Sequence, residues 1–128
     1  MAKILLIDDD KEFRGFVAAG LEHKGHKVTV ASSGRFLTSG SGKADFGATF
    51  DLVITDVLMP DVDGIEVVRM VKAANPKCKV IAMSGGGRFR KSSMLLHLAD
   101  ALGAELTLAK PFAITDLCHT VDGVLKAA

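Results

Sequence analysis

The 128-residue chain has no tryptophan, no tyrosine and only three prolines, and it contains just two cysteines. Cys78 and Cys118 form no CxxC pair and have no histidine cluster beside them, so their spacing gives no support to a zinc site. We expect both to be buried thiols in a reducing compartment. The four histidines are scattered along the chain, and we expect them on the solvated surface.

The sequence also lacks a charge of one sign and any long apolar run. Sixteen basic residues nearly balance fifteen acidic ones, which argues against a broad surface for nucleic acid or anionic lipid. No signal peptide or membrane-spanning segment is present, so we expect a cytoplasmic protein without direct nucleic-acid or membrane partners. A hydrophobic content of 48% argues against disorder and fits one domain over residues 1–128.

Short apolar runs recur along the chain and predict strands that are buried on both faces. The clearest are residues 4–7, 52–54, 80–83 and 106–109, and residues 28–30 form a weaker fifth. Helical patterns lie between them, over residues 13–21, 65–72 and 114–125. This alternation predicts an α/β fold with a parallel sheet covered by helices on both faces.

Two stretches of the chain complicate this pattern. Phe13, Phe16, Val17 and Leu21 recur at the spacing of one helical face, which we expect to be buried. The glycine-rich stretch 34–48 disfavours a long helix, and a short helix with a loop is expected there. An interdomain linker is the alternative for that stretch.

Polar residues follow the predicted strands at the edge where open parallel sheets bind ligands. They are Asp8, Asp9 and Asp10 after the first strand, Asp56 after the third, Ser84 after the fourth and Lys110 after the fifth. Carboxylates brought together in one crevice favour Mg²⁺, which prefers oxygen ligands and suits phosphoryl chemistry. The first three acids could instead cap a helix N-terminus, a role that suits Asp10 best.

Four segments in this order and spacing resemble the response-regulator receiver domain of two-component systems. They are Ile-Asp-Asp-Asp at 7–10, Leu-Val-Ile-Thr-Asp-Val-Leu-Met-Pro-Asp at 52–61 with Gly64, Ala-Met-Ser-Gly at 82–85 and Lys-Pro-Phe at 110–112. The resemblance spans nearly the whole chain. It implies a flavodoxin-like, doubly wound five-stranded parallel sheet of order 2-1-3-4-5 with five helices.

The resemblance also implies a function and a set of site residues. Asp56 would accept a phosphoryl group from a phosphohistidine on a sensor histidine kinase or histidine phosphotransfer protein. Asp9 would bind Mg²⁺ directly and Asp8 through water, with the Leu58 backbone carbonyl and Asp56 as further ligands. Ser84 and Lys110 would contact the phosphoryl group. The chain would catalyse only its own phosphorylation and dephosphorylation, and it would switch binding to an unknown downstream protein.

Three positions depart from the family pattern. Thr107 stands where receivers usually carry an aromatic residue that takes part in switching with Ser84. Leu58 and Gly86 replace residues that are often polar and that orient a hydrolytic water, so we expect a long-lived phosphoryl group on Asp56.

Three alternatives remain open on the sequence alone. A pseudo-receiver would act as a protein-binding adaptor without phosphorylation. A Mg²⁺-dependent phosphatase with an aspartate nucleophile would need a second acid two positions after Asp56, where Leu58 stands. We expect a stand-alone receiver, and a fragment of a longer regulator is the other reading.

Overall fold

A computed structural model of the chain describes residues 2–32, 50–56, 64–84, 103–104, 106–109 and 113–126. The strands are β1 (Lys3–Ile7), β2 (Lys27–Ala31), β3 (Leu52–Asp56), β4 (Lys79–Ser84) and β5 (Leu106–Ala109). They form one sheet in the order β2-β1-β3-β4-β5, and all four neighbouring pairs are parallel. The predicted parallel α/β architecture is therefore confirmed, and the strand order agrees with the expected one.

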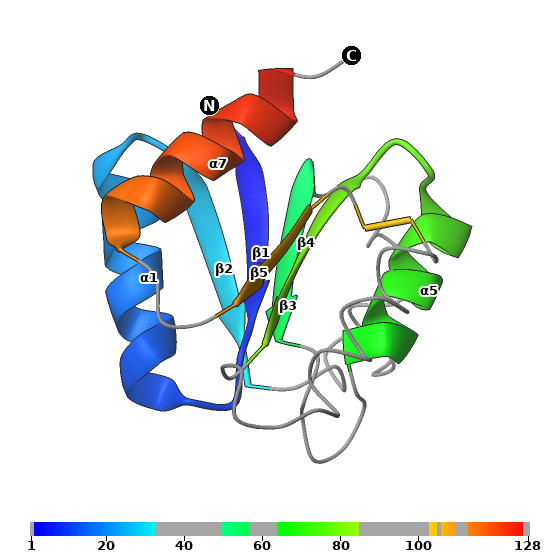
Figure 1. The fold of residues 1–128 in the computed structure, drawn as a ribbon, viewed down its shortest axis with the longest axis horizontal. Coiled ribbons are helices and arrows are strands. Elements are labelled where there is room, and N and C mark those ends of the chain that lie inside the picture. The colour runs from blue at the N-terminus through cyan, green and yellow to red at the C-terminus, as the bar shows by residue number, and fades with distance from the viewer. Residues whose placement is uncertain are drawn as a thin grey trace.

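Three helices lie in the described part of the chain, namely α1 (Lys11–His23), α5 (Gly64–Ala74) and α7 (Ile114–Lys126). Helices α1 and α7 cover one face of the sheet and α5 covers the other (Figure 1). The other two expected helices would fall in segments outside the described residues. Among the residues that the structure describes, no helix is both long enough and apolar enough to cross a membrane.

The core has two halves because alternate residues of each central strand point to opposite faces of the sheet. In β1, Leu5 and Ile7 join the cluster under α5, whereas Ile4 and Leu6 join the cluster under α1 and α7. All four side chains are completely buried, and burying such a side chain stabilises a fold by roughly 1.5–3 kcal/mol. This two-sided burial explains why the central strands are continuous apolar runs. The prediction of burial on both faces is wrong for the edge strands, where Val30 of β2 and Leu106 of β5 are 45% and 42% exposed.

The predicted buried face of α1 is correct except at one position. Val17 and Leu21 are completely buried and Phe13 packs against the same cluster, but the side chain of Phe16 is 56% exposed. Phe16 stands five residues before Leu21, which places it about 140° away around the helix. It therefore points to solvent and not to the sheet.

The prediction that the histidines lie on the surface is wrong for His26. Helix α1 ends at His23, and Gly25 turns the chain into β2 with a φ of 94°. This turn places His26 under the end of α7, where its side chain is only 9% exposed and its Nδ1 is buried without a hydrogen-bond partner. His23 and His119 are exposed as expected, and both cysteines are buried and form no disulfide bond, as expected.

Candidate metal centre

The topology of the sheet brings two acidic segments together. Strands β1 and β3 are neighbours, and Ile7 pairs with Thr55 in their register. Asp8 is the residue after Ile7, and Asp56 is the residue after Thr55 and ends β3. Two carboxylates that are 48 positions apart in sequence therefore lie at adjacent strand ends, as the parallel arrangement predicts.

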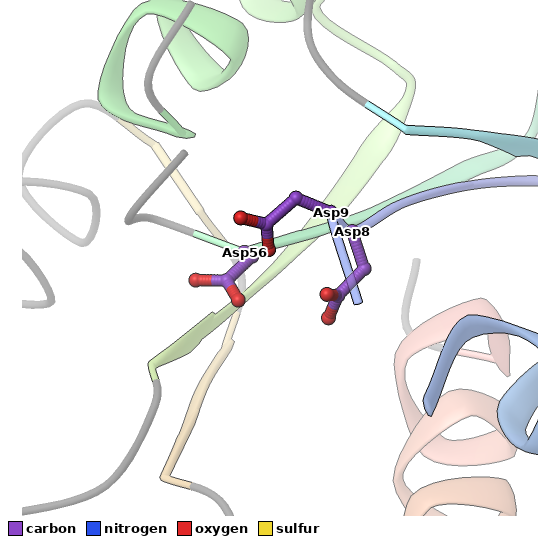
Figure 2. Close-up of side chains that lie close together, drawn as sticks. All are labelled: Asp8, Asp9 and Asp56. Carbon is purple, nitrogen blue, oxygen red and sulfur yellow. The ribbon is translucent and has the colours of Figure 1, made fainter. Parts of the chain in front are cut away.

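Three carboxyl groups gather at this point. One oxygen from each of Asp8, Asp9 and Asp56 lies within 4.8 Å of the others (Figure 2). Asp8 is completely buried, Asp56 is 5% exposed, and Asp9 lies at the exposed side of the group. The cluster thus has two buried members and one member open to solvent.

Charge repulsion makes this cluster a natural cation site. Two full negative charges at that separation repel by about 3.5 kcal/mol at an effective dielectric constant of about 20. A divalent cation offsets this repulsion, and carboxylate oxygens without histidine or cysteine are the ligands that Mg²⁺ prefers. The donor set of Asp8, Asp9 and Asp56 therefore fits the expected Mg²⁺.

Hydrogen bonds hold the turn after β1 in place. The Asp8 amide donates to the carbonyl of Ala31 at 3.1 Å, and the Asp10 amide donates to Oδ1 of Asp8 at 2.9 Å. The Asp10 carboxylate accepts from the amides of Glu12 and Phe13, both at 3.1 Å. Asp10 is therefore the N-cap of α1, in agreement with the capping role expected for it.

The remaining predicted site residues are only partly placed. Ser84 ends β4, next to the strand that carries Asp56, and Thr107 lies in β5 opposite Ala82. Their side chains are outside the described part of the structure. Leu58 and Lys110 lie outside the described residues altogether.

Sequence reasoning did not single out Arg14. Its Nη1 donates to the backbone carbonyl of Asp8 at 2.8 Å. An arginine one turn into a helix is ordinary in sequence, so no pattern pointed to it. The contact depends on how α1 folds back against the turn after β1.

The thiol of Cys118 on α7 is buried, and its Sγ lies 3.9 Å from the carbonyl oxygen of Gly20 on α1. Burial raises the pKa of this thiol, the ammonium of Lys24 lowers it and the carboxylate of Asp122 raises it. The net direction is upward. Cys118 is therefore a packing residue of the α1–α7 contact.

Comparison with known proteins agrees with the fold. The profile of the response regulator receiver domain family matches residues 4–122. The response regulator receiver protein CpdR of Brucella abortus is 31% identical over the full length of both chains. The transcriptional regulatory protein CusR of Escherichia coli is 32% identical over 97% of this chain but only 51% of its own.

Solved structures show the same architecture. A receiver domain from Clostridium thermocellum has a TM-score of 0.80 at 30% identity, and it covers 98% of this chain and 94% of its own. The BeF3-activated DrrB receiver domain has a TM-score of 0.83 at 27% identity, with 99% of each chain covered.

Several relatives are larger than this chain. The chain spans about half of CusR and 24% of the DNA-binding transcriptional regulator NtrC of Azospirillum brasilense. Since proteins of this group include DNA-binding regulators, the expectation of no nucleic-acid partner finds no support in the comparisons.

Proposed function

Since this chain belongs to the response regulator receiver domain family of two-component systems, we propose that it is a Mg²⁺-dependent phosphorylation switch with Asp56 as the phosphate acceptor. The observation that supports this proposal best is the group formed by Asp8, Asp9 and Asp56 at the ends of β1 and β3. A nucleophilic carboxylate beside two further carboxylates is an arrangement that suits metal-assisted phosphoryl transfer.

The transfer uses a carboxylate oxygen of Asp56 as the nucleophile. That oxygen attacks the phosphorus of a phosphohistidine, the P–N bond breaks, and the imidazole leaves with the electron pair of that bond. The product is an acyl phosphate on Asp56. The phosphohistidine belongs to a sensor histidine kinase or a histidine phosphotransfer protein, the donors that act on receiver domains.

The other site residues have supporting roles in this proposal. Asp9 and Asp8 hold Mg²⁺ together with Asp56 and the Leu58 carbonyl, and the bound ion offsets charge on the phosphoryl oxygens. Ser84 donates a hydrogen bond to a phosphoryl oxygen, and the Lys110 ammonium pairs with another. The position of Ser84 at the end of β4, beside β3, supports its part in this scheme.

The output of the switch is proposed to be binding of a downstream protein. The chain, as a single receiver domain, would turn over no external substrate and would catalyse only its own phosphorylation and dephosphorylation. A cytoplasmic location belongs to the same proposal and is supported by the two buried cysteines, which form no disulfide bond. We also propose that Thr107 moves with Ser84 in place of the usual aromatic residue.

Phosphorylation by acetyl phosphate in the presence of Mg²⁺ tests the proposal. Intact mass spectrometry should show a gain of one phosphoryl group, and peptide mapping should place it on Asp56. The decay of the modified species then measures the phosphoryl lifetime, which we expect to be long.

The chain offers a matched control for this experiment at the opposite end of β3. Asp51 is exposed, and its Oδ2 accepts from the Lys3 amide at 2.9 Å. Asp56→Asn should abolish phosphorylation, whereas Asp51→Asn should leave it intact. Labelling that persists in Asp56→Asn, or no response of the wild type to acetyl phosphate or beryllofluoride, would overturn the proposal and favour an adaptor without phosphorylation.

A further inference from the structure

The turn that carries Asp8 and Asp9 accepts a hydrogen bond from a side chain of the following helix. Arg14, in the second turn of α1, reaches back across six positions and donates from Nη1 to the carbonyl of Asp8 at 2.8 Å. Arg14 is half-buried, and this hydrogen bond is partly shielded from water. A charged donor makes a stronger hydrogen bond than a neutral one.

Arg14 contacts the turn through its backbone as well. Its amide donates to the carbonyl of Asp10 at 2.9 Å, the first main-chain bond of α1. Arg14 therefore donates hydrogen bonds to the carbonyls of Asp8 and Asp10, the two neighbours of Asp9. On the opposite side, the Asp8 amide is bonded to Ala31 of β2. The two peptide groups that flank Asp8 are thus held from β2, through Ala31, and from α1, through Arg14.

Arginine suits this position for a geometric reason. Its planar guanidinium offers several donors in a rigid fork, whereas a lysine ammonium is a point charge on a flexible stem. Arg14 also lines an open groove between α1 and β2, together with Lys11, Val28 and Val30. Replacement by lysine keeps the positive charge but loses the planar arrangement of donors that directs the hydrogen bond.

Arg14 has two opposite effects on a cation in the acidic cluster. Its positive charge repels the cation, which weakens binding, and its hydrogen bond preorganises the two aspartates, which strengthens binding. If Arg14 acted only through its charge, its removal would strengthen cation binding. If it acts by positioning the aspartates, its removal weakens cation binding. This difference makes the role of Arg14 measurable.

We propose that Arg14 is a positioning residue for the metal centre. In this proposal, its hydrogen bond to the Asp8 carbonyl raises the Mg²⁺ affinity by more than its positive charge lowers it. The proposal rests on the proposed function as far as the identity of the ion is concerned. Its structural part concerns the turn itself and holds in the metal-free protein.

The test compares Arg14→Lys and Arg14→Met with the wild type. Amide hydrogen exchange of Asp8 and Asp10, followed by NMR without metal, should be faster by about tenfold in both variants, as expected for loss of one charge-assisted bond. Titration with Mg²⁺, followed by the same amide signals, should show that the Mg²⁺ affinity is weakened by about tenfold in both variants.

A matched control is available on α5, where Arg69 pairs with Glu66 on the exposed surface. Arg69→Lys and Arg69→Met should leave the exchange of Asp8 and Asp10 and the Mg²⁺ affinity unchanged. These variants control for the loss of a guanidinium elsewhere in the fold. Circular dichroism shows whether each variant is folded, and Arg14→Lys decides the matter should Arg14→Met fail to fold.

The outcomes separate this inference from the proposed function. Tighter Mg²⁺ binding in Arg14→Met with no change in Arg14→Lys would mean that Arg14 acts through charge and would overturn the inference. Unchanged exchange of Asp8 and Asp10 in both variants would overturn it as well. A wild-type protein that binds no Mg²⁺ would overturn the proposed function, while the exchange rates still decide whether Arg14 holds the turn.

Discussion

Asp8, Asp9 and Asp10 show how the same side chain takes different roles in consecutive positions. Asp8 is completely buried and accepts a hydrogen bond from the Asp10 amide. Asp9 is exposed and contributes to the acidic cluster, and Asp10 turns away to cap α1. The roles follow from the change of backbone direction between strand and helix, which gives each side chain a different environment.

Replacing the cap residue tests this division of roles. Asp10→Ala removes the acceptor for the Glu12 and Phe13 amides, so we expect the free energy of unfolding to fall by about 1 kcal/mol. The Mg²⁺ affinity should stay near that of the wild type, because Asp10 lies outside the acidic cluster. Urea denaturation measures the first quantity and a Mg²⁺ titration the second.

The complementary variant is Asp9→Asn. It should weaken Mg²⁺ binding strongly while leaving the urea midpoint of the metal-free protein unchanged or higher, since it removes one charge of the cluster. Strong loss of Mg²⁺ affinity in Asp10→Ala with little loss in Asp9→Asn would contradict the assignment of ligand and cap.

The reactivity of Cys118 is a second test at the scale of one residue. Burial raises the pKa of its thiol, so a smaller fraction is thiolate at any pH than in a free cysteine. In a Cys78→Ser background, alkylation by iodoacetamide should therefore be slow at neutral pH. The rise of the alkylation rate with pH should occur at a higher pH than for a free thiol. Unfolding in urea should restore the ordinary profile. A folded protein whose thiol reacts like a free cysteine would refute this expectation.

At the scale of elements, continuous apolar runs were sufficient to predict the central strands. Residues 4–7 and 52–54 have no polar interruption because both faces of β1 and β3 are covered, and the structure extends these strands by only one or two residues. The acidic cluster was predictable for the same reason, since parallel strands place Asp8 and Asp56 at one edge.

Features that depend on how elements meet were not predictable. The exposure of Phe16, the burial of His26 and the bond from Arg14 to Asp8 all arise from the placement of a helix end or face against a neighbour. Periodicity gives the apolar face of a helix only to within a residue or two. A long polar side chain such as Arg14 has many possible partners in sequence, and only the fold selects one.

The contact between α1 and α7 depends on a glycine. A Cβ at Gly20 would clash with Cγ1 of Ile114, whereas a Cβ at Gly15 on the same helix would meet nothing within 4 Å. Alanine raises helix propensity at both positions by about 1 kcal/mol, but overpacking costs about 1–3 kcal/mol. Gly20→Ala should therefore unfold more easily than Gly15→Ala by at least about 1 kcal/mol in urea denaturation. Equal stability of the two variants would show that Ile114 moves aside at no cost.

At the scale of the whole molecule, the acidic cluster connects metal binding to stability. Its members come from the segment after β1 and from the end of β3, so the site exists only when these strands pair in register. A cation that binds there binds the folded chain and not the unfolded one. Binding must therefore stabilise the fold by mass action.

This linkage yields a prediction for the metal-dependent stability. Mg²⁺ at a hundred times its dissociation constant should raise the free energy of unfolding by about 2.7 kcal/mol, and excess EDTA should reverse the gain. Asp9→Asn should lose most of this gain at the same Mg²⁺ concentration, because it removes one ligand of the cluster. Asp51→Asn, at the other end of β3, should keep all of it. Thermal or urea denaturation with and without Mg²⁺ measures these differences, and equal gains in Asp9→Asn and Asp51→Asn would mean that the ion stabilises the protein from a different place.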